Sequence, residues 1–352
     1  MKGRFLIGKY KKNKNRQSNI ELLRIVLILM IIVLHYNNGA MGGALANIHN
    51  GTFSYYFVHF TESLSSVAVN VFILITGYFS YNKNKIFISK IARLVLLMIF
   101  WGLSLSLFTM LVLNPALFTV HNCLKMVKIA ISQWFVIIYS ILYLLIPYIN
   151  TVIRVISKKN YQKLLIIAIF FFYIWPTFYT STTSNDAGYG IVNFVCLYLI
   201  GAYIRKFQTA KIAKWKSFCV YVVLSGITMV FSLYFENAWN YNSIFVLGGA
   251  VALFEFFTSL NIKYNPLINT LASFTFSVYL INVNGLFNKY LCQVIFHSNE
   301  YWQSPMIAFN GIIAMIGIYV IGICLEFLRS ILLDKKIFKP LIKIVKGTIE
   351  VQ

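Results

Sequence analysis

Acidic residues are scarce in this sequence: Asp and Glu together number 9 in 352 residues, against 31 Lys and Arg. Charged residues make up only 11% of the chain, whereas they make up about 25% of an average soluble domain. Hydrophobic residues account for 59%. This balance excludes a soluble globular protein and predicts one that crosses a membrane several times.

Cysteines are also few, and their number, five, is odd. Cys196, Cys219 and Cys324 fall within apolar runs, where buried thiols are usually inert, and Cys123 and Cys292 lie toward the outer side, where a pair is the less favoured alternative. Long polar stretches are missing as well, because no segment between the apolar runs is long enough to bury a core of its own. We expect one membrane domain with an all-α fold, no separate soluble domain and no metal ion.

Ten apolar runs are long enough to cross a membrane as helices of about 17 to 25 residues. They are residues 19–36, 62–80, 92–113, 131–149, 163–180, 188–204, 217–235, 243–260, 267–288 and 305–329. Of the Lys and Arg residues, 27 fall on one side of these runs, 3 fall on the other, and Arg24 lies inside the first run. The positive-inside rule then predicts that both termini are cytoplasmic.

This distribution also explains the formal net charge of +22. The basic residues form short clusters between hydrophobic runs, which is typical of topology signals and argues against nucleic-acid binding. The predicted organisation is a polytopic transmembrane helical bundle, residues 19–333. A basic cytoplasmic segment, residues 1–18, precedes it, and a basic cytoplasmic tail, residues 334–352, follows it.

The first apolar run contains two ionisable side chains, Arg24 and His35, eleven residues apart. On a helix, eleven residues advance roughly 16 Å and return to within about 20° of the starting direction, so both side chains share one face. An intramembrane ionisable pair indicates a functional site. The alternative is that Arg24 reaches the headgroups beside Glu21 while His35 is an interfacial residue.

Three glutamates fall within the predicted spans, where a carboxylate is costly unless it has a partner or faces water. We interpret Glu326 as the ion-pair partner of Arg329, three residues on, and Glu62 as interfacial. Glu255 lies deeper, in the eighth run, and is a candidate for the polar interior on the substrate side.

Five segments follow one another in an order that resembles a known family. They are NIELLRIVLILMIIVLHY (19–36), VNVFILITGYF (69–79), KIARL (90–94), WFVIIYSILYLLIPYIN (134–150) and SFTFSVYLIN (273–282). Together they resemble the acyltransferase 3 family of bacterial integral-membrane O-acyltransferases. The resemblance covers essentially the whole chain, and it implies ten spans with cytoplasmic termini, in a multi-pass protein of the bacterial cytoplasmic membrane.

The resemblance also implies roles for particular residues. Arg24 and His35 match the family's basic residue and histidine with ten residues between them, and Lys90 with Arg93 resembles its paired-arginine motif. Two positions depart from the pattern. Lys90 replaces the first arginine and loses bidentate phosphate geometry. Asn282 stands where many members have histidine, which leaves it as a hydrogen-bond donor to substrate or intermediate.

The chemistry expected is transfer of an acyl group from a thioester to a hydroxyl. His35 would take the hydroxyl proton or carry the acyl group itself. Arg24, Lys90 and Arg93 would bind the phosphates of a cytoplasmic acyl-CoA, most simply acetyl-CoA. Trp134, which opens the fourth span, is a further candidate on the substrate side. The expected acceptor is a hydroxyl of a cell-surface glycan or of its lipid-linked precursor, and membrane lipid is the remaining partner.

Two other classes of membrane protein stay open. A glycan polymerase or ligase usually acts through one long outer loop, and the longest outer connection here has about 25 residues. A transporter or flippase for a lipid-linked sugar predicts inverted repeats and broken helices near the midplane. Neither feature is evident in the sequence.

Overall fold

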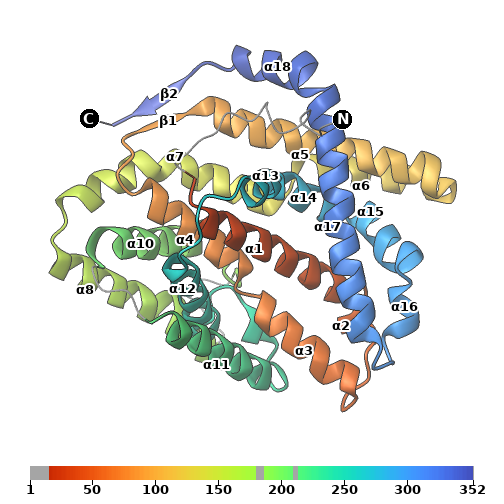
Figure 1. Ribbon diagram of the computed structural model, residues 1–352, viewed down its shortest axis with the longest axis horizontal. Coiled ribbons are helices and arrows are strands. Elements are labelled where there is room, and N and C mark those ends of the chain that lie inside the picture. The colour runs from red at the N-terminus through yellow and green to blue at the C-terminus, as the bar shows by residue number, and fades with distance from the viewer. Residues whose placement is uncertain (1–15, 180–185, 209–212, 352) are drawn as a thin grey trace.

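The computed structural model describes residues 16–179, 186–208 and 213–351, and it is a bundle of helices (Figure 1). Most of the predicted N-terminal segment lies outside these residues. The α-helices are α1 (Ser18–Asn37), α2 (Ala44–Asn47), α3 (Phe53–Ser65), α4 (Ala68–Ser80), α5 (Ile88–Phe108), α6 (Val120–Ile131), α7 (Trp134–Val155), α8 (Lys158–Ile169), α9 (Trp175–Phe178), α10 (Ile191–Phe207), α11 (Lys214–Ser232), α12 (Ile244–Ser259), α13 (Pro266–Ser273), α14 (Thr275–Asn282), α15 (Gly285–Tyr290), α16 (Ser298–Tyr301), α17 (Ile307–Leu332) and α18 (Lys339–Ile344).

Short helical turns extend or connect these helices, and two short strands pair with each other. The turns are η1 (Thr109–Leu113), η2 (Pro115–Leu117), η3 (Phe170–Ile174), η4 (Glu236–Trp239), η5 (Leu291–Ile295) and η6 (Asp334–Phe338), and the strands are β1 (Lys85–Phe87) and β2 (Thr348–Glu350). The predicted all-α class is confirmed.

The predicted spans coincide with helices of the structure. Within the described residues, eight helical segments are long and apolar enough to cross a membrane, and a ninth counts if a bent pair is taken as one span. Helix α10 falls on the sixth predicted run, and its 17 residues reach the lower limit of about 17 for a membrane-spanning helix. The cytoplasmic position of both termini stays a prediction.

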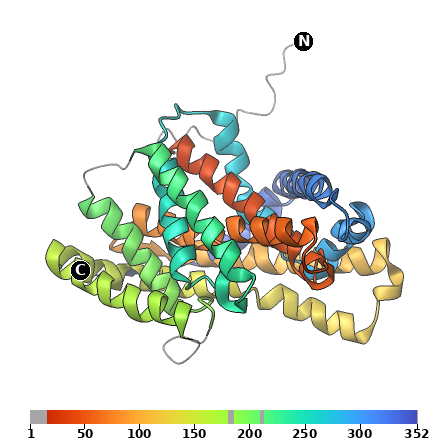
Figure 2. The same ribbon diagram turned by 90° about the horizontal axis from the view of Figure 1, so that it is seen from below.

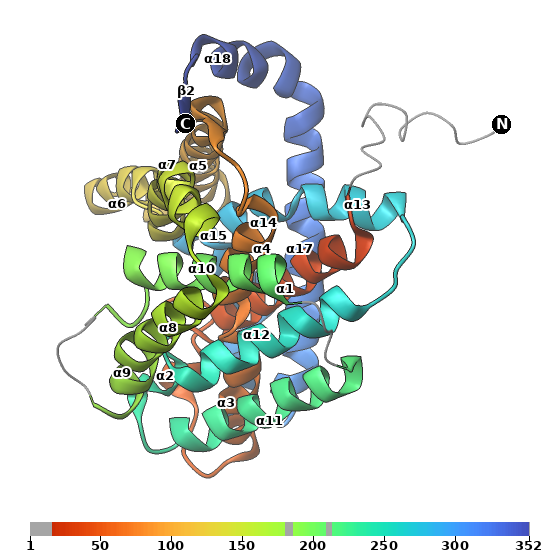
Figure 3. The ribbon, with the colours of Figure 1, turned by 90° about the vertical axis from the view of Figure 1, so that its left-hand side faces the viewer.

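Helix α1 occupies the interior of the bundle, between α3, α4, α12, α14 and α17 (Figure 3). A helix that is apolar on all sides is stable only when other helices surround it. Leu23, Leu27 and Ile32 accordingly have no exposed surface. Polar groups on α1 therefore face the protein interior. In contrast, α5 and α6 pack side by side and extend away from the rest of the bundle (Figure 2).

Helices α4 and α10 approach closely through two glycines. A Cβ on Gly77 of α4 would collide with the backbone of Tyr198, and one on Gly201 of α10 would collide with the backbone of Leu74. Small residues let membrane helices pack backbone to backbone, where dispersion rather than the hydrophobic effect holds them together. This contact fixes the position of α4 against α10.

The ninth predicted span, residues 267–288, is not one helix. Its two halves, Pro266–Asn282 and Gly285–Ile295, meet at an angle of 83°. Asn284 caps α15 by accepting a hydrogen bond from Phe287 N–H, and its amide nitrogen lies 3.0 Å from the Ser106 hydroxyl of α5. Asn284 thus satisfies one backbone N–H group that the break frees and joins the break to α5, as a broken helix inside a membrane protein requires. The expectation of a continuous helix was wrong here.

The C-terminal tail folds back onto the bundle rather than leaving it. Strand β2 pairs antiparallel with β1, with Ile349 opposite Ile86, and Lys85 forms an ion pair with Glu350 at 2.8 Å. The ring of Phe338 packs edge to face against Phe100 of α5 with centroids 5.5 Å apart. The tail thus closes over the start of α5.

Candidate active site

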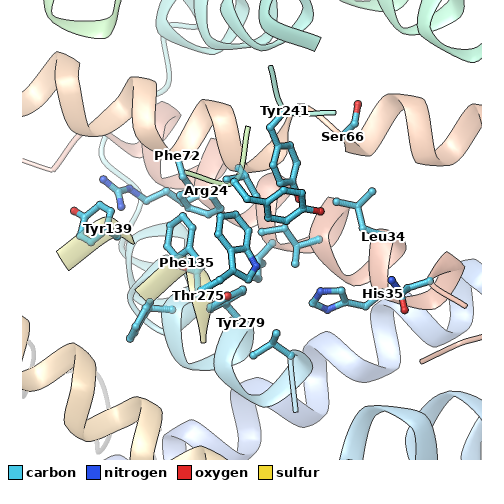
Figure 4. Close-up of a pocket in the computed structure, with 18 of the residues that line it drawn as sticks. Arg24, Leu34, His35, Ser66, Phe72, Phe135, Tyr139, Tyr241, Thr275 and Tyr279 are labelled. Atoms are coloured by element: carbon cyan, nitrogen blue, oxygen red, sulfur yellow. The ribbon is translucent and has the colours of Figure 1, made fainter. Parts of the chain in front are cut away.

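A cavity of about 630 Å³ extends along α1 from Arg24 to Asn38. Its walls come mainly from α1, α3, α4, α7 and α14, and Tyr189 and the residues around η4 contribute one end. Figure 4 shows Arg24 and His35 on opposite sides of it. Aromatic side chains lie between them, namely those of Phe72, Phe135, Tyr241 and Tyr279. The two side chains line one cavity, as their spacing predicts.

His35 lies in the last turn of α1 and contacts Asn282 at the bend of the broken span. The amide nitrogen of Asn282 is 2.7 Å from His35 Nδ1. The amide of Asn288 in turn donates to the backbone oxygen of Asn282, at 2.5 Å, and to its side-chain oxygen. The thiol of Cys292 donates to the side-chain oxygen of Asn288 at 3.0 Å. Asn282, Asn288 and Cys292 have no exposed surface.

This chain of hydrogen bonds fixes the tautomer of His35. A backbone carbonyl can only accept, so the Asn288 atom that faces it must be the amide nitrogen. That nitrogen also bonds to the Asn282 side chain, whose facing atom must then be oxygen. The amide nitrogen of Asn282 is left to donate to His35 Nδ1, which places the ring proton on Nε2. Among the described residues, no hydrogen-bond partner occupies Nε2.

Asn282 itself does not line the cavity. The sequence predicted that it contacts substrate or intermediate, whereas the structure places it behind His35. Its amide orients the imidazole and holds one ring nitrogen as an acceptor. We therefore describe Asn282 as a positioning residue. The break after α14 turns the chain back, so that Asn288 reaches Asn282 and holds its side chain in this orientation.

Arg24 forms only a long ion pair with the nearby glutamate. Glu21 accepts two hydrogen bonds from Arg16, at 3.0 and 2.5 Å. The Nε atom of Arg24 is 3.9 Å from Glu21 and, among the described residues, it is buried without a hydrogen-bond partner. An unpaired buried donor costs about 1 to 3 kcal/mol, and more when it is charged. Glu21 is thus engaged mainly by Arg16, and Arg24 lies in the wall of the cavity.

A second orphaned donor belongs to a residue of the cavity wall. Tyr279 lines the cavity, and within the described part of the chain its hydroxyl is buried without a hydrogen-bond partner. Ligand cavities are generally about 300 to 1,000 Å³ and place a few polar groups on an apolar wall. A cation at one end, an unpaired hydroxyl and an imidazole N–H fit a ligand with an anionic part and a carbonyl.

The other predicted site residues divide between the cavity and its surroundings. Trp134 lines the cavity. Lys90 and Arg93 are exposed on α5 and do not line it, although Leu94, the next residue after Arg93, does. Glu255 is buried in α12 and does not line this cavity, and its assignment to the substrate side stays a prediction.

Two further acidic or polar groups differ from the sequence interpretation. Glu326 does pair with Arg329, through two contacts of 2.8 Å, but both side chains are buried rather than on the bundle surface. Glu62, interpreted as interfacial, lines the cavity. The Asn288 contact was also missed, although three asparagines within INVNGLFN, an otherwise apolar segment, were a visible signal.

A family model described as an acyltransferase domain matches residues 17–325. The chain belongs to the acyltransferase 3 family. No curated protein and no solved structure gave a significant match. The matched range includes the α1 pair, the broken ninth span and every wall of the cavity, so the acyltransferase 3 fold supplies the whole candidate site. The protein is a membrane acyltransferase.

Proposed function

We propose that this acyltransferase is an O-acyltransferase, most simply an O-acetyltransferase, whose donor is a cytoplasmic acyl-CoA. The observation that supports this assignment most directly is the single cavity that joins Arg24 to His35. Arg24 would contact the donor's phosphates, and the thioester carbonyl would lie at His35. Guanidinium groups bind phosphates through charge-assisted hydrogen bonds, which are roughly twice as strong as neutral ones.

The proposed acceptor is a hydroxyl of a cell-surface glycan or of its lipid-linked precursor, in the cytoplasmic membrane of a bacterium. Aromatic and polar side chains share the wall of the His35 end, including Tyr189, Trp239 and Asn240. Sugar-binding surfaces combine such flat apolar faces with hydrogen-bonding groups. This support bears on the chemical class of the acceptor.

The test is to incubate purified protein in lipid vesicles with acetyl-CoA labelled in the acetyl group, together with glycan acceptors. Label is expected to leave the thioester and appear in an ester. A lipid-linked sugar flippase would move its lipid without consuming thioester, and a glycan polymerase would lengthen the glycan without labelling it. Absence of any acyl transfer would contradict the proposal.

Arg24→Ala is expected to weaken binding of acetyl-CoA by at least about tenfold, because one charge-assisted hydrogen bond contributes about 1.5 to 3 kcal/mol. Isothermal titration in detergent would measure the affinity. Arg154→Ala removes the same charge from an exposed site on α7 outside the cavity and should change the affinity only a few-fold, as exposed charges contribute about 0.2 to 1 kcal/mol. Equal affinities for Arg24→Ala and wild type would exclude Arg24 from the donor site.

A further inference from the structure

Among the described residues that line the cavity, Glu62 of α3 is the only one with a carboxylate. Asn37, two residues beyond His35, holds it: the Asn37 amide donates to Glu62 Oε2 at 2.9 Å. The carboxylate therefore lies at the His35 end, while Arg24 lies about three helical turns away on α1. One cavity thus has a cationic end and an anionic end.

The Glu62 carboxylate has most of its hydrogen-bonding capacity left. The Asn37 amide is shared with the hydroxyl of Thr61, at 3.3 Å, and within residues 16–179, 186–208 and 213–351 no cation forms an ion pair with Glu62. An ionised carboxylate offers about four lone-pair positions. A carboxylate in an enclosed site needs such partners, since burying it without them is costly. Its free oxygen is suited to a ligand that donates a hydrogen bond.

Aromatic rings surround this end of the cavity. Tyr189 lies against Trp134 and Tyr241, with ring centroids 4.6 and 4.9 Å apart. The indole of Trp239 is fixed by a hydrogen bond of 2.8 Å to the hydroxyl of Ser63. The negative faces of such rings attract the weakly positive C–H groups of a sugar ring. Rings and a carboxylate together fit a neutral sugar, with one hydroxyl directed at Glu62.

In the tautomer that Asn282 sets, His35 is not the base that attack by a hydroxyl requires, which departs from the role expected from the sequence. Its Nδ1 lone pair accepts from Asn282, and Nε2 carries the proton. A neutral imidazole of this tautomer presents a donor to the cavity, which can bind the thioester carbonyl oxygen as negative charge develops on it. The proton of the attacking hydroxyl must then go to another group.

We propose that Glu62 is that group: it binds a hydroxyl of a neutral sugar acceptor and takes its proton during acyl transfer. This inference rests on the acyl-CoA function proposed above. The acceptor oxygen forms a bond to the thioester carbon while its proton passes to Glu62, and His35 Nε2–H donates to the carbonyl oxygen. The carbon–sulfur bond then breaks, and the departing thiolate takes the proton from Glu62. The products are an ester and free coenzyme A thiol, and Glu62 is again ionised.

The experiment compares two acceptors with wild type and Glu62→Gln, in the full-length protein reconstituted in vesicles. Thiol release from acetyl-CoA is followed with methyl glucoside, a neutral sugar, and with hydroxylamine, whose free lone pair attacks without a base. Glu62→Gln is expected to lose at least 10²-fold with methyl glucoside and to stay within about fivefold of wild type with hydroxylamine. Glu300→Gln, the same change at an exposed site on α16 outside the cavity, should leave both rates unchanged.

Each other outcome decides against a defined part of the proposal. Wild type that acylates neither acceptor would overturn the proposed acyl-CoA function itself. Wild type that acylates hydroxylamine but not methyl glucoside would overturn the neutral sugar acceptor. An equal loss with both acceptors in Glu62→Gln would make the carboxylate structural, and full activity with both would remove it from the reaction.

Discussion

Replacing His35 by alanine is expected to lower acyl transfer at least 10²-fold, with methyl glucoside and with hydroxylamine alike. The change removes the donor that faces the thioester carbonyl, and loss of one such donor typically costs 10² to 10³ in rate. Because the loss is independent of the acceptor, it differs from the loss expected for Glu62→Gln. Initial rates of thiol release from acetyl-CoA would measure both.

The control for this variant is His49→Ala, which removes an exposed histidine that does not line the cavity. It should keep the wild-type rate. His35→Ala should also keep the donor affinity of wild type, since Arg24 and the rest of the cavity remain. A His35→Ala protein that is folded, binds acetyl-CoA and turns over within twofold of wild type would show that His35 takes no part in the reaction.

Asn282→Leu is expected to reduce turnover by about 10²-fold or more while leaving the Michaelis constant for acetyl-CoA near that of wild type. The side chain does not touch the cavity, so the loss would act through His35: without the amide donor, the ring is free to change tautomer and orientation. A wrong tautomer at a catalytic histidine has lowered turnover by about 10⁴ in a serine protease. Steady-state kinetics in vesicles would separate the two constants.

Asn282→His provides the matched comparison, because an imidazole retains an N–H that can donate to His35. It should keep more activity than the leucine variant. Thermal unfolding must accompany both, since Asn282 is fully buried and also accepts a hydrogen bond from Asn288. A well-folded leucine variant with turnover within twofold of wild type would mean that Asn282 is only a helix-packing residue.

The sequence predicts the helices and the α1 pair well because both depend on local regularities. Apolar runs of spanning length mark the helices, and helical periodicity alone places Arg24 and His35 on one face. Motif order was equally informative, since the family assignment rests on segments distributed over the whole chain and the family model matches residues 17–325.

The parts that the sequence did not predict depend on how separate helices meet. Asn284 and Ser106 stabilise the break in the ninth span, and they are 178 residues apart. Glu62 lies at the start of an apolar run, where an interfacial position is the usual interpretation, yet Asn37 draws it into the cavity. Glu255 is the opposite case. Its position deep within the eighth run indicated a place in the polar interior, but its side chain does not line the cavity.

The pairing of β1 with β2 binds the C-terminal segment to the loop before α5. The backbone N–H of Val351 donates to Asn84 at 3.1 Å, so almost the last residue of the chain is bound to the loop before α5. On its other side, that loop is held by the amide of Asn150, which donates to the backbone oxygens of Ser80 and Lys83. The C-terminal segment and α7 therefore hold the loop that leads into α5 from two sides. Removing residues 348–351 would take away β2 and its pairing with β1, and the loop would then be held by Asn150 of α7 and by the hydrogen bond from Ile88 N–H to the backbone oxygen of Gly347.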